Sequence, residues 1–171
     1  VYVAFENATK KENNLVVPLV IKSTNILNHK EKEWQFHWFS PLIIFSILFF
    51  ITLTTTYKDQ KRNKRSKWLD FILYFFTGIL GVLILFLWFF TDHSTTPNNF
   101  NFLWAFAPNI FIAFMLLKRK LNTWVIRYCK LIILLLFIYS VIWIFGIQLM
   151  SLCMLPILGI LFLRNYFLIK K

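Results

Sequence analysis

Five long apolar blocks, separated by short polar gaps, constrain this chain more than any other feature of its sequence. Each block is close to the ~20 residues that a helix needs to cross the ~30 Å hydrocarbon layer of a bilayer. We therefore predict an all-α fold, a polytopic membrane helix bundle with five transmembrane helices. The predicted spans cover residues 38–56, 69–90, 97–117, 124–147 and 149–163.

Lysine and arginine are distributed unevenly among the gaps. They concentrate between residues 58 and 67, between 118 and 130 and after the fifth span from Arg164, whereas the gaps at 91–101 and 146–148 contain none. Positive residues beside helix ends are retained in the cytoplasm. We therefore predict that the N-terminus and the 91–101 loop lie outside and that the C-terminus is cytoplasmic.

The segment before the first span, residues 1–37, has mixed polarity. Its β-prone runs at 1–5 and 15–21 predict one or two short strands in an exported connector. The first residue is Val1, and no signal peptide precedes the first span. Because a segment of this length needs export, we expect the chain to be the C-terminal piece of a larger protein. The alternative is a short tail that crosses unaided.

Local signals refine the predicted spans. Ser40 precedes a proline, which predicts the start of the first span. Gly78 and Gly81 lie near one face of the second span and predict close packing against a neighbouring helix. Pro108 and Pro156 fall inside the third and fifth spans, where each removes a backbone hydrogen bond and predicts a kink. The fourth and fifth spans are expected to form a tight antiparallel hairpin.

Charge and cysteine content exclude several functions. A net charge of +12 would ordinarily favour nucleic-acid binding, but topology and anionic inner-leaflet lipids account for it, so we expect no nucleic-acid partner. No charged residue lies at mid-membrane depth in any predicted span, which argues against a proton-coupled pump or ion transporter. Cys129 and Cys153 fall at different depths and predict no disulfide. No phosphate loop or zinc-type spacing occurs, so we expect no metal and no cofactor.

The densest polar cluster is the predicted outer gap from residue 91 to 101. Adjacent Asp92 and His93 can supply a general base whose imidazolium is stabilised by a carboxylate. The side chains of Asn98, Asn99 and Asn101 can donate hydrogen bonds to an ester or amide oxygen. Asp92 and His93 are therefore candidate catalytic residues, and the three asparagines are candidate substrate-binding residues.

Two tryptophans flank this cluster. Trp88 and Trp104 are interfacial belt residues first and walls of a lipid-binding site second. A plainer interpretation stands beside the functional one, because a short loop outside the membrane has to be polar and Thr and Asn commonly cap helices. Under that interpretation the Asp–His pair only solvates the loop. The sequence by itself leaves both interpretations open.

Residues 80–93 and 98–105, together with Pro108, resemble the membrane region of the Lnb-type bacterial lipoprotein N-acyltransferases, long known as a domain of unknown function. Residues 5–9 and 15–16 are similar to the stretch that joins that family's exported domain to its first span. The resemblance covers most of the chain, and its specificity is concentrated between residues 91 and 104.

The resemblance implies transfer of a fatty acyl group to the N-terminal amine of a lipoprotein cysteine, at the outer surface of the bacterial inner membrane. In that family an exported papain-like domain carries a Cys and His pair. This chain contains no such domain, and neither of its cysteines is placed to replace the nucleophile. We therefore expect it to anchor the protein and to position a phospholipid acyl donor or a lipoprotein substrate. The alternative is a non-catalytic anchor or assembly scaffold, and the sequence does not predict an oligomeric state.

Overall fold

The computed structural model describes residues 8–12, 15–18, 40–91 and 99–171, and the chain divides into two units, Val1–His37 and Trp38–Lys171. In the first unit, β1 (Thr9–Glu12) pairs antiparallel with β2 (Leu15–Pro18), with Glu12 opposite Leu15. Strand β2 lies within the predicted run at 15–21. Strand β1 was not expected, and the predicted run at 1–5 lies outside the described residues.

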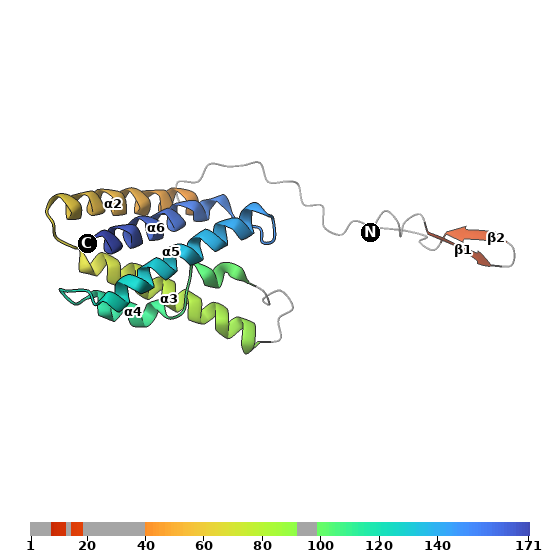
Figure 1. Ribbon diagram of the computed structural model, residues 1–171. Helices are drawn as coiled ribbons and strands as arrows, with labels where there is room; N and C mark the ends of the chain where they lie inside the picture. Colours follow the sequence, from red (N-terminus) through yellow and green to blue (C-terminus); the bar gives the residue numbers. More distant parts are fainter. Residues whose placement is uncertain (1–7, 13–14, 19–39, 92–98) are drawn as a thin grey trace. The chain divides into compact units, whose positions relative to one another are not determined.

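The described part of the second unit is a bundle of helices and short links (Figure 1). Four stretches among the described residues are long and apolar enough to cross a membrane: α2, α3, α5, and the stretch that joins η2 to α6. The predicted multi-pass membrane fold is therefore confirmed. The bounds are α2 Pro41–Lys61, α3 Lys67–Phe89, η1 Phe100–Leu103, α4 Asn109–Leu116, α5 Thr123–Ile144, η2 Leu152–Met154 and α6 Leu155–Lys170.

The first span begins as predicted. The Ser40 hydroxyl accepts a hydrogen bond from the backbone N–H of Ile43, and Pro41 occupies the first turn, where its missing N–H costs nothing. The helix continues to Lys61, beyond the expected end at residue 56. Its last turns therefore carry polar residues that the sequence placed in a loop.

The third apolar block does not form one helix over 97–117, so that prediction is wrong. It contains the 3-10 turn η1 and then α4, whose 8 residues cover only about 12 Å at 1.5 Å per residue. Pro108 is the N-cap of α4 and not the kink of a longer helix. A proline has no N–H to donate and its ring obstructs the preceding turn, so the helix starts after it. The expected start at Pro97 lies outside the described residues.

Close packing lets this irregular backbone lie against α3. A Cβ added to Gly78 would overlap the backbone of Ile110, and one added to Gly81 would overlap the backbone of Ala105 and Ala107. Both glycines are buried. The predicted role of Gly78 and Gly81 as small packing residues is therefore confirmed, and their neighbour is the third block.

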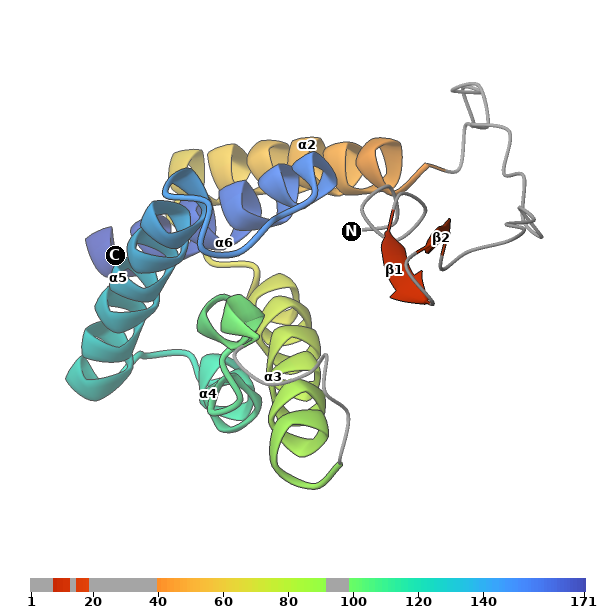
Figure 2. The same ribbon diagram turned by 90° about the vertical axis from the view of Figure 1, so that its right-hand side faces the viewer.

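Aromatic contacts extend this pairing along nearly all of α3. Near its end, the ring of Trp88 lies 5.8 Å from that of Phe102; near its start, the ring of Phe71 lies 5.4 Å from that of Phe114. The third block therefore runs antiparallel to α3 from one end of the bundle to the other. It makes this passage as two short helical pieces joined by non-helical backbone (Figure 2).

The last helix also differs from the prediction. Pro156 lies in the first turn of α6, so the expected kink inside a span at 149–163 is wrong. The helix then continues past Arg164, which the sequence placed in a cytoplasmic tail, to Lys170. Arg164 is only 1 % exposed. A charged residue that the sequence placed outside the spans is thus part of the buried interior of the bundle, and its neutralising partners are described below.

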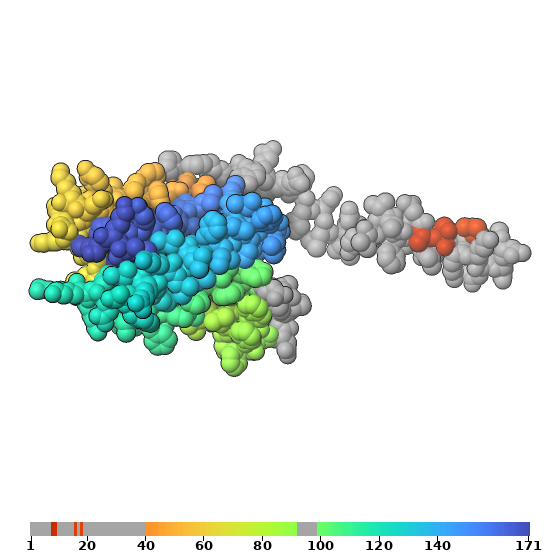
Figure 3. All heavy atoms as spheres, in the orientation of Figure 1, coloured from red at the N-terminus to blue at the C-terminus, as the bar shows by residue number. Residues whose placement is uncertain are grey.

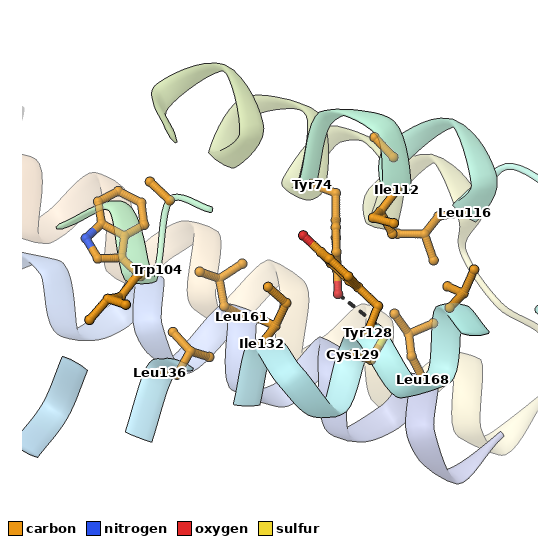
Figure 4. Close-up of a cluster of buried hydrophobic side chains, with 14 of the residues drawn as sticks. Tyr74, Trp104, Ile112, Leu116, Tyr128, Cys129, Ile132, Leu136, Leu161 and Leu168 are labelled. Carbon is orange, nitrogen blue, oxygen red and sulfur yellow. Dashed lines mark hydrogen bonds between the residues drawn. The ribbon is translucent and has the colours of Figure 1, made fainter. Parts of the chain in front are cut away.

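Helix α6 packs against both α2 and α5, while α3 and α4 form the other side of the bundle (Figure 2). The buried core lies between these two groups. Figure 4 shows its centre, where Tyr74 of α3, Tyr128 and Cys129 of α5, and Leu161 of α6 converge. Cys129 and Cys153 are both free thiols, as predicted.

Candidate functional site

Residues 99–101, the end of the 91–101 cluster that the structure describes, are held by a network of side-chain hydrogen bonds. Asn101 Oδ1 accepts one bond from Trp104 Nε1 at 2.9 Å and another from the Tyr139 hydroxyl at 2.6 Å. Its Nδ2 donates to Asn99 Oδ1 at 2.7 Å. Because Tyr139 belongs to α5, the Asn101 amide joins η1 to a helix far away in the sequence.

A second connection reaches the link between α5 and α6. The backbone N–H of Phe100 donates to Gln148 Oε1 at 2.7 Å, and Gln148 Nε2 donates to Asn99 Oδ1 at 3.3 Å. The link begins with a turn at Gly146, whose φ of 68° suits a residue without a Cβ. The segment that carries Asn99 and Asn101 is therefore fastened to the α5–α6 hairpin.

The two candidate tryptophans have different environments. Trp104 is 6 % exposed, and its indole N–H is committed to Asn101. Trp88 is partly exposed and lies against the rings of Phe89 and Phe102. Trp88 is thus the one with surface available to a lipid, whereas Trp104 fixes the asparagine beside it.

Three predicted site residues, Asp92, His93 and Asn98, lie outside the described residues. The structure therefore brings together Asn99, Asn101 and Trp104 but leaves their relation to the Asp–His pair undescribed. Sequence reasoning missed two members of the network. These are Tyr139 and Gln148, which stand in predominantly apolar sequence; a hydroxyl and an amide near one end of the bundle were the available signal.

A second polar group lies deeper in the bundle. Asn109 donates to Thr77 Oγ1 at 3.0 Å and accepts from the Tyr128 hydroxyl at 2.6 Å, so it joins α4 to α3 and α5. Tyr74 donates to Asn165 Oδ1, which connects α3 to α6. Such bonds satisfy polar side chains that cannot reach water. Their role is to hold helices together.

The third polar group is an ion cluster centred on Arg164. Its Nε donates to Asp70 Oδ1 at 2.8 Å, and its NH1 nitrogen lies 3.0 Å from both Asp59 Oδ2 and Thr56 Oγ1. The NH2 nitrogen lies 2.6 Å from Asp70 Oδ1 without a directed hydrogen bond, so that contact is an ion pair by distance alone. Arg65 lies 3.3 Å from the other oxygen of Asp70. Two arginines and two aspartates thus neutralise one another between α2, α3 and α6.

Asp59 also organises the link between α2 and α3. Its carboxylate accepts hydrogen bonds from the backbone N–H of Ser66 at 2.9 Å and from the Ser66 hydroxyl at 2.7 Å. Ser66 is the N-cap residue of α3 but makes no capping bond with its side chain, which is instead held by Asp59.

The surface between α5 and α6 contains an apolar groove of about 650 Å³. Its lining is aliphatic and aromatic except for Lys130 at one end and Ser140 near the other; the remaining residues include Leu134, Phe137, Leu158 and Phe162. Among the residues that the structure describes, no group of three His, Cys, Asp or Glu side chains could hold a metal ion.

No curated protein and no solved structure matches this chain. A family model, that of the Lnb transmembrane domain, matches residues 30–171. The match includes the whole helical bundle and every candidate site residue. The chain therefore belongs to the Lnb transmembrane domain family.

Proposed function

We propose that this chain is the membrane part of a lipoprotein N-acyltransferase of the bacterial inner membrane. In this proposal the segment 91–101 faces the outer surface and holds a phospholipid acyl ester or the N-terminus of a lipoprotein. The family assignment supports the membrane part of an Lnb-type protein. The positioning role is our inference from the geometry of the loop.

The observation that carries the proposal is the fastening of this loop to α5 and to the α5–α6 link. Catalytic and binding groups have to be held close to their productive geometry by side chains that are themselves fixed. Asn101 is fixed by bonds to Trp104 and Tyr139, and Asn99 accepts a bond from Gln148. A polar surface built in this way is suited to orienting a substrate.

His93 is proposed to act as a hydrogen-bond partner or base, and Asp92 to stabilise its imidazolium. Amide formation joins the lipoprotein amine nitrogen to the acyl carbon and breaks the acyl bond to its carrier, so the amine proton must be accepted and a proton returned to the departing atom. His93 would serve this exchange. The side chains of Asn98, Asn99 and Asn101 would position the acyl carbonyl or the amine, and Trp88 would contact the lipid.

The direct test is the His93→Ala substitution in the full-length gene product, followed by mass spectrometry of a lipoprotein N-terminus from cells that depend on the protein. We expect N-acylation to fall by about 100-fold or more, as for loss of a general base. His37→Ala, which removes another histidine from the predicted outer side, is the matched control and should retain activity. Activity of the His93→Ala protein within about twofold of the parent would remove His93 from the mechanism.

A second function, a non-catalytic anchor or scaffold for an exported domain, is favoured by one observation. The side-chain oxygens of Asn99 and Asn101 already accept hydrogen bonds from within the protein. A loop with a purely structural role would need the same bonds. Replacing residues 38–171 by unrelated spans, with any exported domain kept, separates the two functions. A simple anchor tolerates the exchange, whereas a domain that positions substrate does not.

A further inference from the structure

A cavity of about 780 Å³ lies at the basic end of the bundle, away from the asparagine network. It is bordered by the α2–α3 link, the α4–α5 link and the end of α6, which gather at one end in Figure 3. Its lining is dominated by cations. The lining residues are Asn63, Lys64, Arg65, Lys67, Arg119, Lys120, Leu121, Ile126 and Lys171.

The positive charge of this cavity is not balanced by carboxylates. The sequence from Trp38 onward contains three acidic residues, Asp59, Asp70 and Asp92. The first two are buried and engaged with Arg164 and Arg65. Within the part of the chain that the structure describes, no carboxylate pairs with the other cations of the lining, which are Lys64, Lys67, Arg119, Lys120 and Lys171.

The two basic links are held in place beside one another. The Arg65 guanidinium donates to the backbone carbonyl of Lys118 at 2.6 Å while its other nitrogen contacts Asp70, and its side chain is 5 % exposed. Asn63 adopts φ of 51°, the left-handed conformation that lets α2 end in a sharp turn. Arg65 thus holds the α2–α3 link against the α4–α5 link. The lysines and Arg119 therefore surround a cavity that exists before any ligand binds.

We propose that this cavity binds the phosphate group of a net-anionic ligand. A phosphate has several acceptor oxygens, so it can bind cations on two sides at once. Here Lys64 and Lys67 lie on one side of the cavity, and Arg119 and Lys120 lie on the other. A phospholipid headgroup is the favoured source. The cavity lies at the end of a membrane bundle, and Leu121 and Ile126 give it an apolar wall for the glycerol region. The proposal is independent of the acyltransferase function.

Native mass spectrometry of the purified full-length protein in detergent tests the proposal. The probes are dioleoyl phosphatidylglycerol, dioleoyl phosphatidylcholine and inorganic phosphate. We expect the parent protein to retain phosphatidylglycerol selectively. The variants R119Q/K120Q and K64Q/K67Q should each lower this retention by about fivefold or more, because each loses two cations beside the headgroup.

The variant K61Q/R62Q is the matched control. It removes the same charge from the same link, but neither residue lines the cavity. Its retention should stay within about twofold of the parent, since both side chains are exposed and neither contributes to the lining of the cavity. Displacement of the lipid by millimolar inorganic phosphate would identify a site that also accepts free phosphate, and resistance to displacement would identify a lipid site.

Two results would overturn the proposal. One is an equal loss of phosphatidylglycerol in K61Q/R62Q and R119Q/K120Q, which would mean that diffuse surface charge is responsible. The other is a parent protein that neither prefers phosphatidylglycerol over phosphatidylcholine nor binds phosphate. Thermal unfolding of each variant in phosphatidylcholine micelles, expected to match that of the parent, separates loss of the site from loss of the fold.

Discussion

Arg164 joins three helices, because its guanidinium on α6 contacts Asp59 of α2 and Asp70 of α3. A buried ion pair is not by itself strongly stabilising, since both charges lose their hydration. Removing one partner is a different matter. Without Arg164, Asp59 is buried with no cation to pair with, whereas Asp70 keeps Arg65.

We therefore predict that Arg164→Leu lowers the free energy of unfolding by about 3–5 kcal/mol. Unfolding in mixed micelles with increasing denaturing detergent measures the change. The double variant D59N/R164M, which keeps only the Arg65–Asp70 pair of the cluster and so buries no net charge, should recover part of the loss. Stability of Arg164→Leu equal to the parent would show that the cluster is solvated and not buried.

Tyr139 allows the positioning role of the asparagine network to be tested without altering the asparagines. Tyr139→Phe removes one of the two donors to Asn101 Oδ1, at a cost in stability of about 0.5–1.5 kcal/mol. If the network orients substrate, N-acylation by the full-length protein should fall by about tenfold through misplacement of Asn101. Ser140→Ala is the control, because that hydroxyl bonds only to Leu136 of its own helix. Equal activities of the two variants would contradict the positioning role.

At the scale of elements, the close contact between α3 and the third block depends on two glycines of α3, Gly78 and Gly81, which have no side chain in the way. We predict that Gly81→Ala destabilises the bundle by about 1–3 kcal/mol, because the added methyl group meets backbone that cannot move aside. Gly159→Ala should cost less. Its methyl group would meet only the edge of the Phe49 ring, which can rotate. Thermal unfolding in detergent compares the two, and an equal or smaller effect of Gly81→Ala would contradict the packing described.

Hydropathy was sufficient to predict the helices that face lipid along their full length. The starts and ends of α2, α3 and α5 fall within a few residues of the expected spans, except at the polar end of α2. It was insufficient for the third block. A proline inside an apolar run is compatible with either a kink or a helix start, and the choice here depends on how Gly81 admits the backbone before Pro108.

The same limit applies to α6 and to the candidate site. Arg164 looked like the end of a span because its partners, Asp59 and Asp70, are about a hundred residues away in the sequence. Asn99 and Asn101 could be selected from the local concentration of polar residues. Tyr139 and Gln148 could not, since nothing in their own neighbourhood indicates that the loop lies against them.

At the scale of the whole molecule, sidedness is the property that both proposals require. The α2–α3 and α4–α5 links lie together, joined by Arg65 and Lys118, while the asparagine network lies with the α5–α6 link. Single cysteines at Lys61 and Ile147, introduced into a Cys153→Ser background, test this arrangement, because Cys129 is fully buried.

We predict that a membrane-impermeant maleimide labels the cysteine at position 147 in intact spheroplasts and the cysteine at position 61 only after lysis. Ile147 is 65 % exposed, so its cysteine replacement is accessible. This pattern follows from retention of positive residues in the cytoplasm. Labelling of position 61 in intact spheroplasts would place the asparagine network on the cytoplasmic side and remove the basis for the acyltransferase proposal.

The third block lies along α3 as two short helical pieces, and this affects how the protein inserts into the membrane. The segment after α3 has an 8-residue helix and non-helical backbone at 104–107. By itself it therefore lacks the continuous backbone hydrogen bonds that a helix needs to move from the translocon into lipid. It needs α3 already beside it to shield that backbone. We therefore expect α3 and the segment after it to insert into the membrane together. Insertion should fail when Gly81 is replaced by a bulky residue.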